Sequence, residues 1–397
     1  MKILIICETT LENGRGPVYR LINVLPKLAK WSSVIFVSLG DSDDISKSVI
    51  QQNCQKVYNV EIDFEGWFVK NKSEIANQVM NVVKVHSPDV VVLYWEIWDL
   101  MKEISLSMAS FNIPFAVILH SIPFVDAFPK PSHFLYIDII RRLLREKNWF
   151  VIKFILLRMY QIPRVMRQFE IVSINETVNK YMNLYFPKLE FTSAIPGYAL
   201  ELELIKNSQK SNKDYDFIFM AKLVDGKGIY ELPKIMTLIT IYKKDATLLV
   251  MGSFETNRDE NQFIRIIHKL NLEKNIEMAG WVQGQRKYEL LKSGRIFLYP
   301  SISADTFSFC LLEALACGLP AICYDVPFIK AIYKTDAVLS VPYLNNKEFA
   351  NTALELLKNQ SYLELANSAH KFVEKYSSWE DVAKAELKCY QNIIDKF

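Results

Sequence analysis

Two carboxylates and several hydroxyl side chains stand near residue 300, where one apolar run of the sequence gives way to another. The first run, Ile296–Tyr299, stops at Pro300, and the polar stretch behind it contains Asp305. Glu313 follows eight positions later, inside the second apolar run. Carboxylates accept hydrogen bonds and hydroxyl groups both donate and accept them. These residue types predict that the stretch binds a polar ligand.

The order of these runs is typical of a strand, a loop and a helix. We expect the helix to begin near Phe307, with Thr306 as its cap, and to end at the stop signal Gly318. Its first turn contains no bulky cation. The backbone N–H groups near Ser308 and Phe309 are therefore expected to accept an anion such as a phosphate at the positive end of the helix dipole.

Glu313 falls on the second turn of this otherwise apolar helix. A carboxylate in that position costs free energy unless it is paired or receives hydrogen bonds. The hydroxyl groups of a sugar or a ribose could supply those bonds. Asp305 would lie in the loop at the carboxyl end of the strand, where open α/β sheets bind ligands. Two carboxylates thus flank one helix N-terminus.

A family resemblance rests on this stretch, which reads PSISADTFSFCLLEALACGLPAI. It resembles the signature of the retaining nucleotide-sugar glycosyltransferases of family 4, in which both acidic positions are normally Glu and the first is here Asp305. The resemblance implies the GT-B fold, an α/β architecture of two Rossmann-like domains facing a cleft. It also implies that a hexosyl or N-acetylhexosaminyl group passes from a UDP- or GDP-sugar to an alcohol acceptor, with retention of configuration.

A lysine turn opens the second half of the chain, because a predicted strand at 216–220 is followed by Lys222, Gly226, Lys227 and Gly228. Two lysines around a glycine turn can converge on a diphosphate, although lysines in a polar turn are usually solvated. The turn resembles the cationic residue, Leu and Lys-Gly of the family. By that resemblance the two lysines and the helix N-terminus neutralise the leaving diphosphate, so that no metal or added cofactor is required.

The resemblance assigns further contacts to the donor. Glu313 would hold the ribose hydroxyls, and Asp305 would contact the sugar. The turn after a strand near Ile276–Met278 would hold the nucleotide base, mainly through backbone groups. The nucleotide-binding set implied in this way is Glu313, Phe307, Ser308, Phe309, Trp281, Val282 and Gln283. The family often has Gly-Gly after the strand at 321–324, where this chain has Asp325-Val326-Pro327.

His120 follows a predicted strand at 114–119. A lone histidine is more often a satisfied core or surface residue than a catalytic one. The end of a strand in an α/β sheet, however, points into the ligand crevice, and the family carries a histidine after the corresponding strand. We therefore expect His120 to hydrogen-bond the donor sugar or its phosphate when the cleft closes.

Other polar groups of the N-terminal half have two interpretations. Trp95, Glu96 and Trp98 follow a predicted strand at 89–94, and either form an acceptor wall or pack on the domain surface. Gly14 and Gly16 lack the order of a dinucleotide fingerprint, which argues against NAD or FAD. An Asp-x-Asp run at 41–43 is a metal motif in a different fold and is interpreted here as a solvated turn with a helix cap.

The length of 397 residues leaves room for two domains, each with its own core. We expect an acceptor-binding domain at 1–205, a nucleotide-sugar-binding domain at 206–376, and a C-terminal helix at 377–397 that packs back on the first domain. The net charge of +3 indicates no particular partner, and we expect no nucleic acid. Six cysteines without a C-x-x-C pair favour a reducing, cytoplasmic compartment without a structural metal.

Membrane contact is predicted from residues 134–168, which combine helical apolar spacing with aromatic residues and many more basic than acidic side chains. Such a segment can lie in the surface of an anionic bilayer, although an ordinary helix pair with a solvated basic face has the same pattern. The apolar start, MKILIICETT, is too short for a signal peptide and looks like a first strand. No apolar run reaches the roughly 18 to 20 residues of a spanning helix.

These features favour a lipid-linked or glycan acceptor at the cytoplasmic face of the membrane. Two alternatives remain open. A catalytically weak partner subunit of another glycosyltransferase would explain Asp305 and the missing Gly-Gly. A nucleotide-sugar epimerase on the same fold would turn over its substrate without any acceptor, and a phosphorylase would need phosphate or a pyridoxal cofactor.

Overall fold

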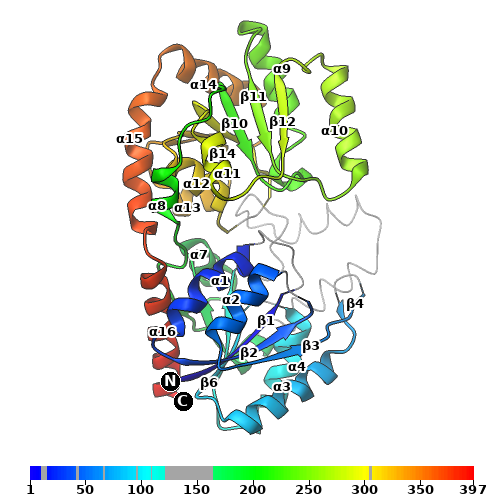
Figure 1. Cartoon of the computed structure of the whole chain (residues 1–397), viewed down its shortest axis with the longest axis vertical. Helices are drawn as coiled ribbons and strands as arrows, with labels where there is room; N and C mark the ends of the chain where they lie inside the picture. The colour runs from blue at the N-terminus through cyan, green and yellow to red at the C-terminus, as the bar shows by residue number, and fades with distance from the viewer. Residues whose placement is uncertain are drawn as a thin grey trace. The chain divides into compact units, whose positions relative to one another are not determined.

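The computed structural model describes residues 1–9, 16–41, 44–65, 68–94, 97–108, 110–120, 164–303 and 306–397. These residues form two compact units (Figure 1). The first contains the described residues up to Ala199 together with Ser378–Phe397, and the second contains Leu200–Ser377. Each unit is built around a parallel sheet, so the predicted α/β architecture of two Rossmann-like halves is confirmed.

The first unit has a seven-stranded sheet among its described residues, in the order β3-β2-β1-β6-β7-β8-β9. All neighbouring strands pair in parallel. The central strands are apolar and buried along their length because helices cover both faces of a parallel sheet. The strands are β1 (Lys2–Glu8), β2 (Ser33–Leu39), β3 (Lys56–Val60), β6 (Val90–Leu93), β7 (Phe115–Leu119), β8 (Glu170–Ser173) and β9 (Thr192–Ser193).

The helices of this unit connect the strands and cover them. Within the described residues they are α1 (Gly16–Leu28), α2 (Asp44–Asn53), α3 (Lys72–His86), α4 (Trp98–Met108), η1 (Met166–Gln168), α7 (Glu176–Tyr185) and α16 (Trp379–Lys396). A small antiparallel pair, β4 (Phe64–Glu65) and β5 (Phe68–Val69), also belongs to it. Helix α16 packs along α1 although the two lie at opposite ends of the chain.

A buried polar cluster joins α16 to the sheet. Arg20 of α1 and Glu386 of α16 are fully buried and form an ion pair. Tyr94 and Tyr390 each donate a hydrogen bond of 2.9 Å to the Glu386 carboxylate. Arg20 Nε also donates to the backbone oxygen of Gly197 at 2.5 Å. Because removing one partner of a buried ion pair leaves the other charge buried and uncompensated, the cluster fixes where α16 docks.

Tyr94 and Tyr390 are expected to remain protonated well above pH 10 as long as the protein is folded. Their desolvation by burial raises the pKa of both phenols, and the negative charge of Glu386 adds to the effect. Above about pH 10 an unfolded tyrosine loses its proton while these two keep theirs, so the free energy of unfolding falls as pH rises. Tyrosinate absorbance, recorded against pH beside circular dichroism, should show a late phase that coincides with unfolding. Complete ionisation near pH 10 in a folded protein would contradict this.

The second unit has a six-stranded sheet among its described residues, in the order β12-β11-β10-β13-β14-β15, again with parallel neighbours. The chain starts at β10, proceeds to one edge, returns to β13 and proceeds to the other. The strands are β10 (Phe217–Met220), β11 (Leu248–Met251), β12 (Ile276–Gly280), β13 (Ile296–Tyr299), β14 (Ala321–Tyr324) and β15 (Val338–Val341).

The helices of the second unit alternate with these strands. They are α8 (Leu202–Asn207), η2 (Asp225–Lys227), α9 (Leu232–Tyr242), α10 (Asn257–Lys269), α11 (Gly284–Leu291), α12 (Phe309–Ala316), α13 (Pro327–Ile332), α14 (Asn346–Lys358), α15 (Tyr362–Val373) and η3 (Glu374–Tyr376). Helix α9 packs against α14, and α12 packs against α15. None of the helices in the described parts of the chain is both long and apolar enough to cross a membrane.

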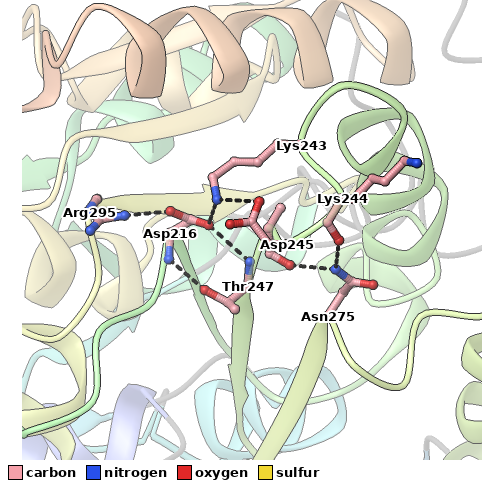
Figure 2. Close-up of polar contacts among 8 residues, drawn as sticks. Asp216, Lys243, Lys244, Asp245, Thr247, Asn275 and Arg295 are labelled. Carbon is pink, nitrogen blue, oxygen red and sulfur yellow. Dashed lines mark hydrogen bonds and ion pairs between the residues drawn. The ribbon is translucent and has the colours of Figure 1, made fainter.

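Buried Asp216 organises the amino ends of these strands (Figure 2). Its backbone N–H donates to the Thr247 hydroxyl at 3.0 Å, and its carboxylate accepts from the Thr247 backbone N–H at 3.1 Å. Arg295 and Lys243 pair with the same carboxylate at 2.6 and 3.1 Å. Asp216 was predicted to begin its strand. The strand β10 begins at Phe217 instead, and the bonds between Asp216 and Thr247 hold the starts of β10 and β11 together at the edge opposite the candidate site.

Candidate functional site

The carboxyl edge of the second sheet brings the lysine turn and the signature loop together. The turn follows β10 and the loop follows β13, and the order of strands reverses between these two neighbours. The backbone oxygen of Gly226 accepts hydrogen bonds from the N–H groups of Ile302 and Ser303, at 3.0 and 2.9 Å. A reversal of this kind opens a crevice at the carboxyl ends of the strands. Two separate sequence motifs thus lie at one place.

Gly228 allows the lysine turn to lie against the signature loop. Its φ of +78° is in the left-handed region, and a Cβ placed there would lie 1.9 Å from the backbone oxygen of Pro300. Any side chain would therefore push the two loops apart. Gly226 has no such restriction, since its nearest neighbour would be the Cβ of Ser303 at 3.4 Å.

Both predicted lysines lie in this turn. Lys222 forms an ion pair with Glu255, which belongs to the loop after β11, and about two fifths of the Lys222 side chain is exposed. Lys227 ends the short helix η2. The backbone of Leu223 joins the same two loops by donating to the oxygen of Ser253 at 2.9 Å. An anion bound at this edge could therefore pair with Lys222 in place of Glu255, whose carboxylate is exposed to solvent.

The start of α12 differs from the prediction. The helix begins at Phe309 rather than near Phe307, and its cap is Ser308 rather than Thr306. The Ser308 hydroxyl accepts from the N–H of Leu311 at 3.2 Å, while the Ser308 N–H donates to the hydroxyl of Tyr333 at 3.2 Å. The Ser308 amide predicted for an anion is therefore already bonded. The end of the helix is confirmed, because α12 ends at Ala316 with Cys317 as its C-cap, and Gly318 follows with a left-handed φ of +80°.

Phe307 takes part in an aromatic cluster instead of starting the helix. Its ring lies 5.3 Å from the ring of Phe309, 6.1 Å from Tyr333 and 6.0 Å from Tyr376, measured between centroids. Such packing fixes the direction in which the chain enters α12. A nucleotide contact of Phe307 stays a prediction.

Glu313 is buried and paired. Its side chain is 6% exposed, and the Nζ of Lys287 lies 2.5 Å from Oε1. The hydroxyl of Tyr288 donates to the same oxygen at 3.2 Å. Both partners belong to α11, so the pair joins the helix after β12 to the helix after the signature loop. The prediction that Glu313 needs a partner is thus met within the protein, by residues that sequence reasoning did not select.

The turn predicted to hold the base leads directly into α11. Trp281 follows the end of β12 and is 51% exposed, and Gln283 is the residue before the first turn of the helix. Lys287 and Tyr288 lie one turn further along. The carboxyl edge of this sheet therefore carries the lysine turn at its centre, with Glu313 and the 281–283 turn connected through α11.

Comparison with known families supports the sequence-based resemblance for this part of the chain. Residues 201–378 match the family model described as glycosyl transferases group 1. The match spans less than half of the chain. The match covers the lysine turn, α11, the signature loop and Glu313.

Several curated relatives of this part of the chain are named after a phosphatidylinositol lipid. The chain is 24% identical over 179 residues to the phosphatidylinositol N-acetylglucosaminyltransferase GPI3 subunit of Saccharomyces cerevisiae, covering 44% of this chain and 38% of the relative. It is 22% identical over 150 residues to the phosphatidyl-myo-inositol mannosyltransferase of Mycobacterium leprae, covering 38% of each. The matches thus span less than half of the length of either relative.

Solved structures resemble the whole chain. A glycosyltransferase from Rickettsia africae superposes with a TM-score of 0.73 at 15% identity, covering 100% of this chain and 99% of that one. The Anabaena protein HepE, solved in complex with UDP, superposes with a TM-score of 0.72 at 13% identity, covering 99% and 100%. The fold of this chain is therefore that of the GT-B glycosyltransferases.

His120 lies in the first unit, outside the residues that match the family model. It follows β7 directly, is 7% exposed, and its ring lies 5.8 Å from the ring of Tyr94. Its position at the carboxyl end of a strand agrees with the pattern that suggested it. Asp305, Trp95 and Glu96 lie outside the described residues, as does the part of the predicted membrane segment before residue 164.

Proposed function

We propose that this chain is a glycosyltransferase that moves a hexosyl or N-acetylhexosaminyl group from a UDP- or GDP-sugar to an alcohol acceptor, with retention. The observation that carries the proposal is the junction at Gly226, which ties the lysine turn to the signature loop at the reversal point of the second sheet. The group 1 domain match covers this junction, and the structural neighbour HepE was solved with UDP.

In this proposal, different residues at the carboxyl edge of the second sheet bind different parts of the donor. Lys222 and Lys227 neutralise the diphosphate as it leaves, which lowers the barrier because negative charge develops there in the transition state. Glu313 accepts hydrogen bonds from the ribose, and residues 281–283 face the base. Asp305 and His120 are proposed to hydrogen-bond the donor sugar. This assignment needs no metal to carry the leaving-group charge.

We further propose a lipid-linked acceptor, with residues 134–168 contacting the membrane. Support comes from the relatives, since the named acceptor of both the yeast subunit and the Mycobacterium enzyme is a phosphatidylinositol. The basic and aromatic composition of residues 134–168 agrees with contact to an anionic membrane surface. We propose that the protein acts at the inner face of the cell membrane.

A thermal-shift and nucleotide-release screen with UDP-, GDP- and ADP-sugars, with and without a membrane lipid extract, tests this function. A donor present at about 100 times its dissociation constant should add roughly 2.7 kcal/mol to the free energy of unfolding. The Lys222→Ala variant should lose most of this stabilisation. Lys213→Ala is the matched control, because Lys213 is also an exposed lysine paired with a glutamate but precedes β10 at its amino end.

Release of nucleotide only in the presence of lipid would identify the acceptor class. Stabilisation by a nucleotide-sugar that turns over without any acceptor would point to an epimerase instead. If no nucleotide-sugar stabilises the protein while anionic vesicles still bind it, the enzyme proposal fails and the partner-subunit alternative takes its place.

A further inference from the structure

The carboxylate of Glu313 is held on one side only. Within the described parts of the chain, both hydrogen bonds that this carboxylate accepts end on Oε1, from Lys287 Nζ and from the Tyr288 hydroxyl. Two donors on one oxygen fix the plane of the carboxylate. Its second oxygen, Oε2, is then available to a ligand.

Lys287 is itself fixed. Only 17% of its side chain is exposed, and its Nζ lies 4.6 Å from the centre of the Tyr288 ring as well as beside the carboxylate. A cation between an aromatic face and a carboxylate has little freedom to move. Holding a long, largely buried cation costs rotamer entropy and desolvation, and apolar residues of similar volume often stabilise a protein as well or better. Stability alone therefore does not explain a lysine at this position.

The position of the pair suggests what it serves. Lys287 lies on the helix that begins after residues 281–283, and Glu313 lies on the helix that begins after the signature loop. The pair thus links the helix that follows the residues proposed for the base to the helix that follows the loop beside the lysines proposed for the diphosphate. The ribose of a nucleotide has the same place between base and diphosphate, and its two hydroxyl groups donate hydrogen bonds to a carboxylate.

We propose that Lys287 is a positioning residue that orients Glu313 toward the ribose hydroxyls of the donor. This inference rests on the proposed function, because it assumes that a nucleotide binds at this edge. Lys287 and Tyr288 hold Oε1, and Oε2 accepts from the ribose. Lys287 thereby sets the preference for a ribonucleotide over a deoxyribonucleotide without touching the sugar itself.

The experiment compares the dissociation constants of UDP and 2′-deoxy-UDP by calorimetry, or of the GDP pair if the screen selects GDP. In the wild type we expect roughly tenfold tighter binding of the ribonucleotide, which corresponds to about 1.4 kcal/mol. Lys287→Met should reduce this preference to less than about threefold, and Lys287→Arg should restore most of it because a cation is present again. In a Glu313→Gln background, Lys287→Met should change the preference no further, since the two residues act as one unit.

Lys292→Met is the matched control. Lys292 follows the same helix and donates to the backbone oxygens of Ile205 and Ser208, at 2.5 and 2.7 Å, so that its role is structural. Its replacement should lower stability and leave the ribose preference unchanged. Tyr288→Phe is the second variant, because it removes one donor from Oε1 while the charge pair stays, and it should lower the preference partly even if Lys287→Met does not fold.

The outcomes separate the two proposals. A folded Lys287→Met protein that keeps the wild-type preference would overturn the positioning role and leave the donor site intact, as would an unchanged preference in Tyr288→Phe. A wild-type protein that binds none of the nucleotides would overturn the proposed function, and this inference with it. If Lys292→Met lost the preference for the ribonucleotide as fully as Lys287→Met does, the cause would be a general destabilisation of α11. That result would also overturn the inference.

Discussion

Replacing Glu386 by alanine is expected to lower the free energy of unfolding by about 3 to 5 kcal/mol. The variant leaves the guanidinium of Arg20 fully buried without its counter-charge, and it removes the acceptor of Tyr94 and Tyr390. The loss should be measured by urea unfolding monitored through tryptophan fluorescence. Glu386→Gln, which retains an acceptor without the charge, should lie between the wild type and the alanine variant.

Glu380→Ala provides the comparison on the same helix. Glu380 pairs with Lys384 one turn away at 3.1 Å, and both side chains are about half exposed. Water screens such a pair, so this variant should unfold close to the wild type. If the two alanine variants proved equally stable, the buried cluster would not be what holds α16 in place.

Gly228→Ala is the second change with a large expected effect. The alanine would need a left-handed backbone, which costs roughly 1 to 2 kcal/mol, and its Cβ would meet the backbone oxygen of Pro300 at 1.9 Å. The backbone must shift to remove this clash, which costs about 1 to 3 kcal/mol. The free energy of unfolding should therefore fall by about 2 to 5 kcal/mol in total. Because the shift separates the lysine turn from the signature loop, binding of the donor nucleotide should also fall at temperatures where the variant remains folded.

Gly226→Ala is the control two residues away. Its Cβ would meet only the Ser303 side chain at an ordinary contact distance, so stability should change by no more than about 0.5 kcal/mol. Thermal unfolding and calorimetry with UDP would measure both properties in both variants. Normal nucleotide affinity in a folded Gly228→Ala protein would show that the contact between the two loops does not matter for the donor.

The sheets of this protein were predictable because their strands are buried on both faces. Segments such as Val90–Leu93 and Ile296–Tyr299 are unbroken apolar runs that end at polar or proline residues, and nothing distant is needed to recognise them. The boundaries that moved depend on side chains. At Asp216, for example, the side-chain carboxylate accepts a hydrogen bond from the Thr247 backbone N–H, and the strand begins one residue later.

The candidate site was predictable in its loops and less so in its contacts. Thr306 and Ser308 are equally suitable caps by type, and the hydroxyl of Tyr333, 25 positions away, lies against the backbone of Ser308. The polarity of Glu313 indicated that it needs a partner, but Lys287 lies 26 positions earlier and no local pattern joins the two. Pairings of this kind follow from how two helices pack, which one sequence does not show.

The return of α16 to the first unit affects how the chain is made. Tyr94 and Glu386, which bond in the buried cluster, are 292 positions apart. At roughly 5 to 20 residues per second, a ribosome needs roughly 15 to 60 seconds to travel that distance. Throughout this time Arg20, which is made before Tyr94, still lacks its counter-charge. The described residues of the second unit all lie within Leu200–Ser377, so this unit can finish folding before α16 packs against α1.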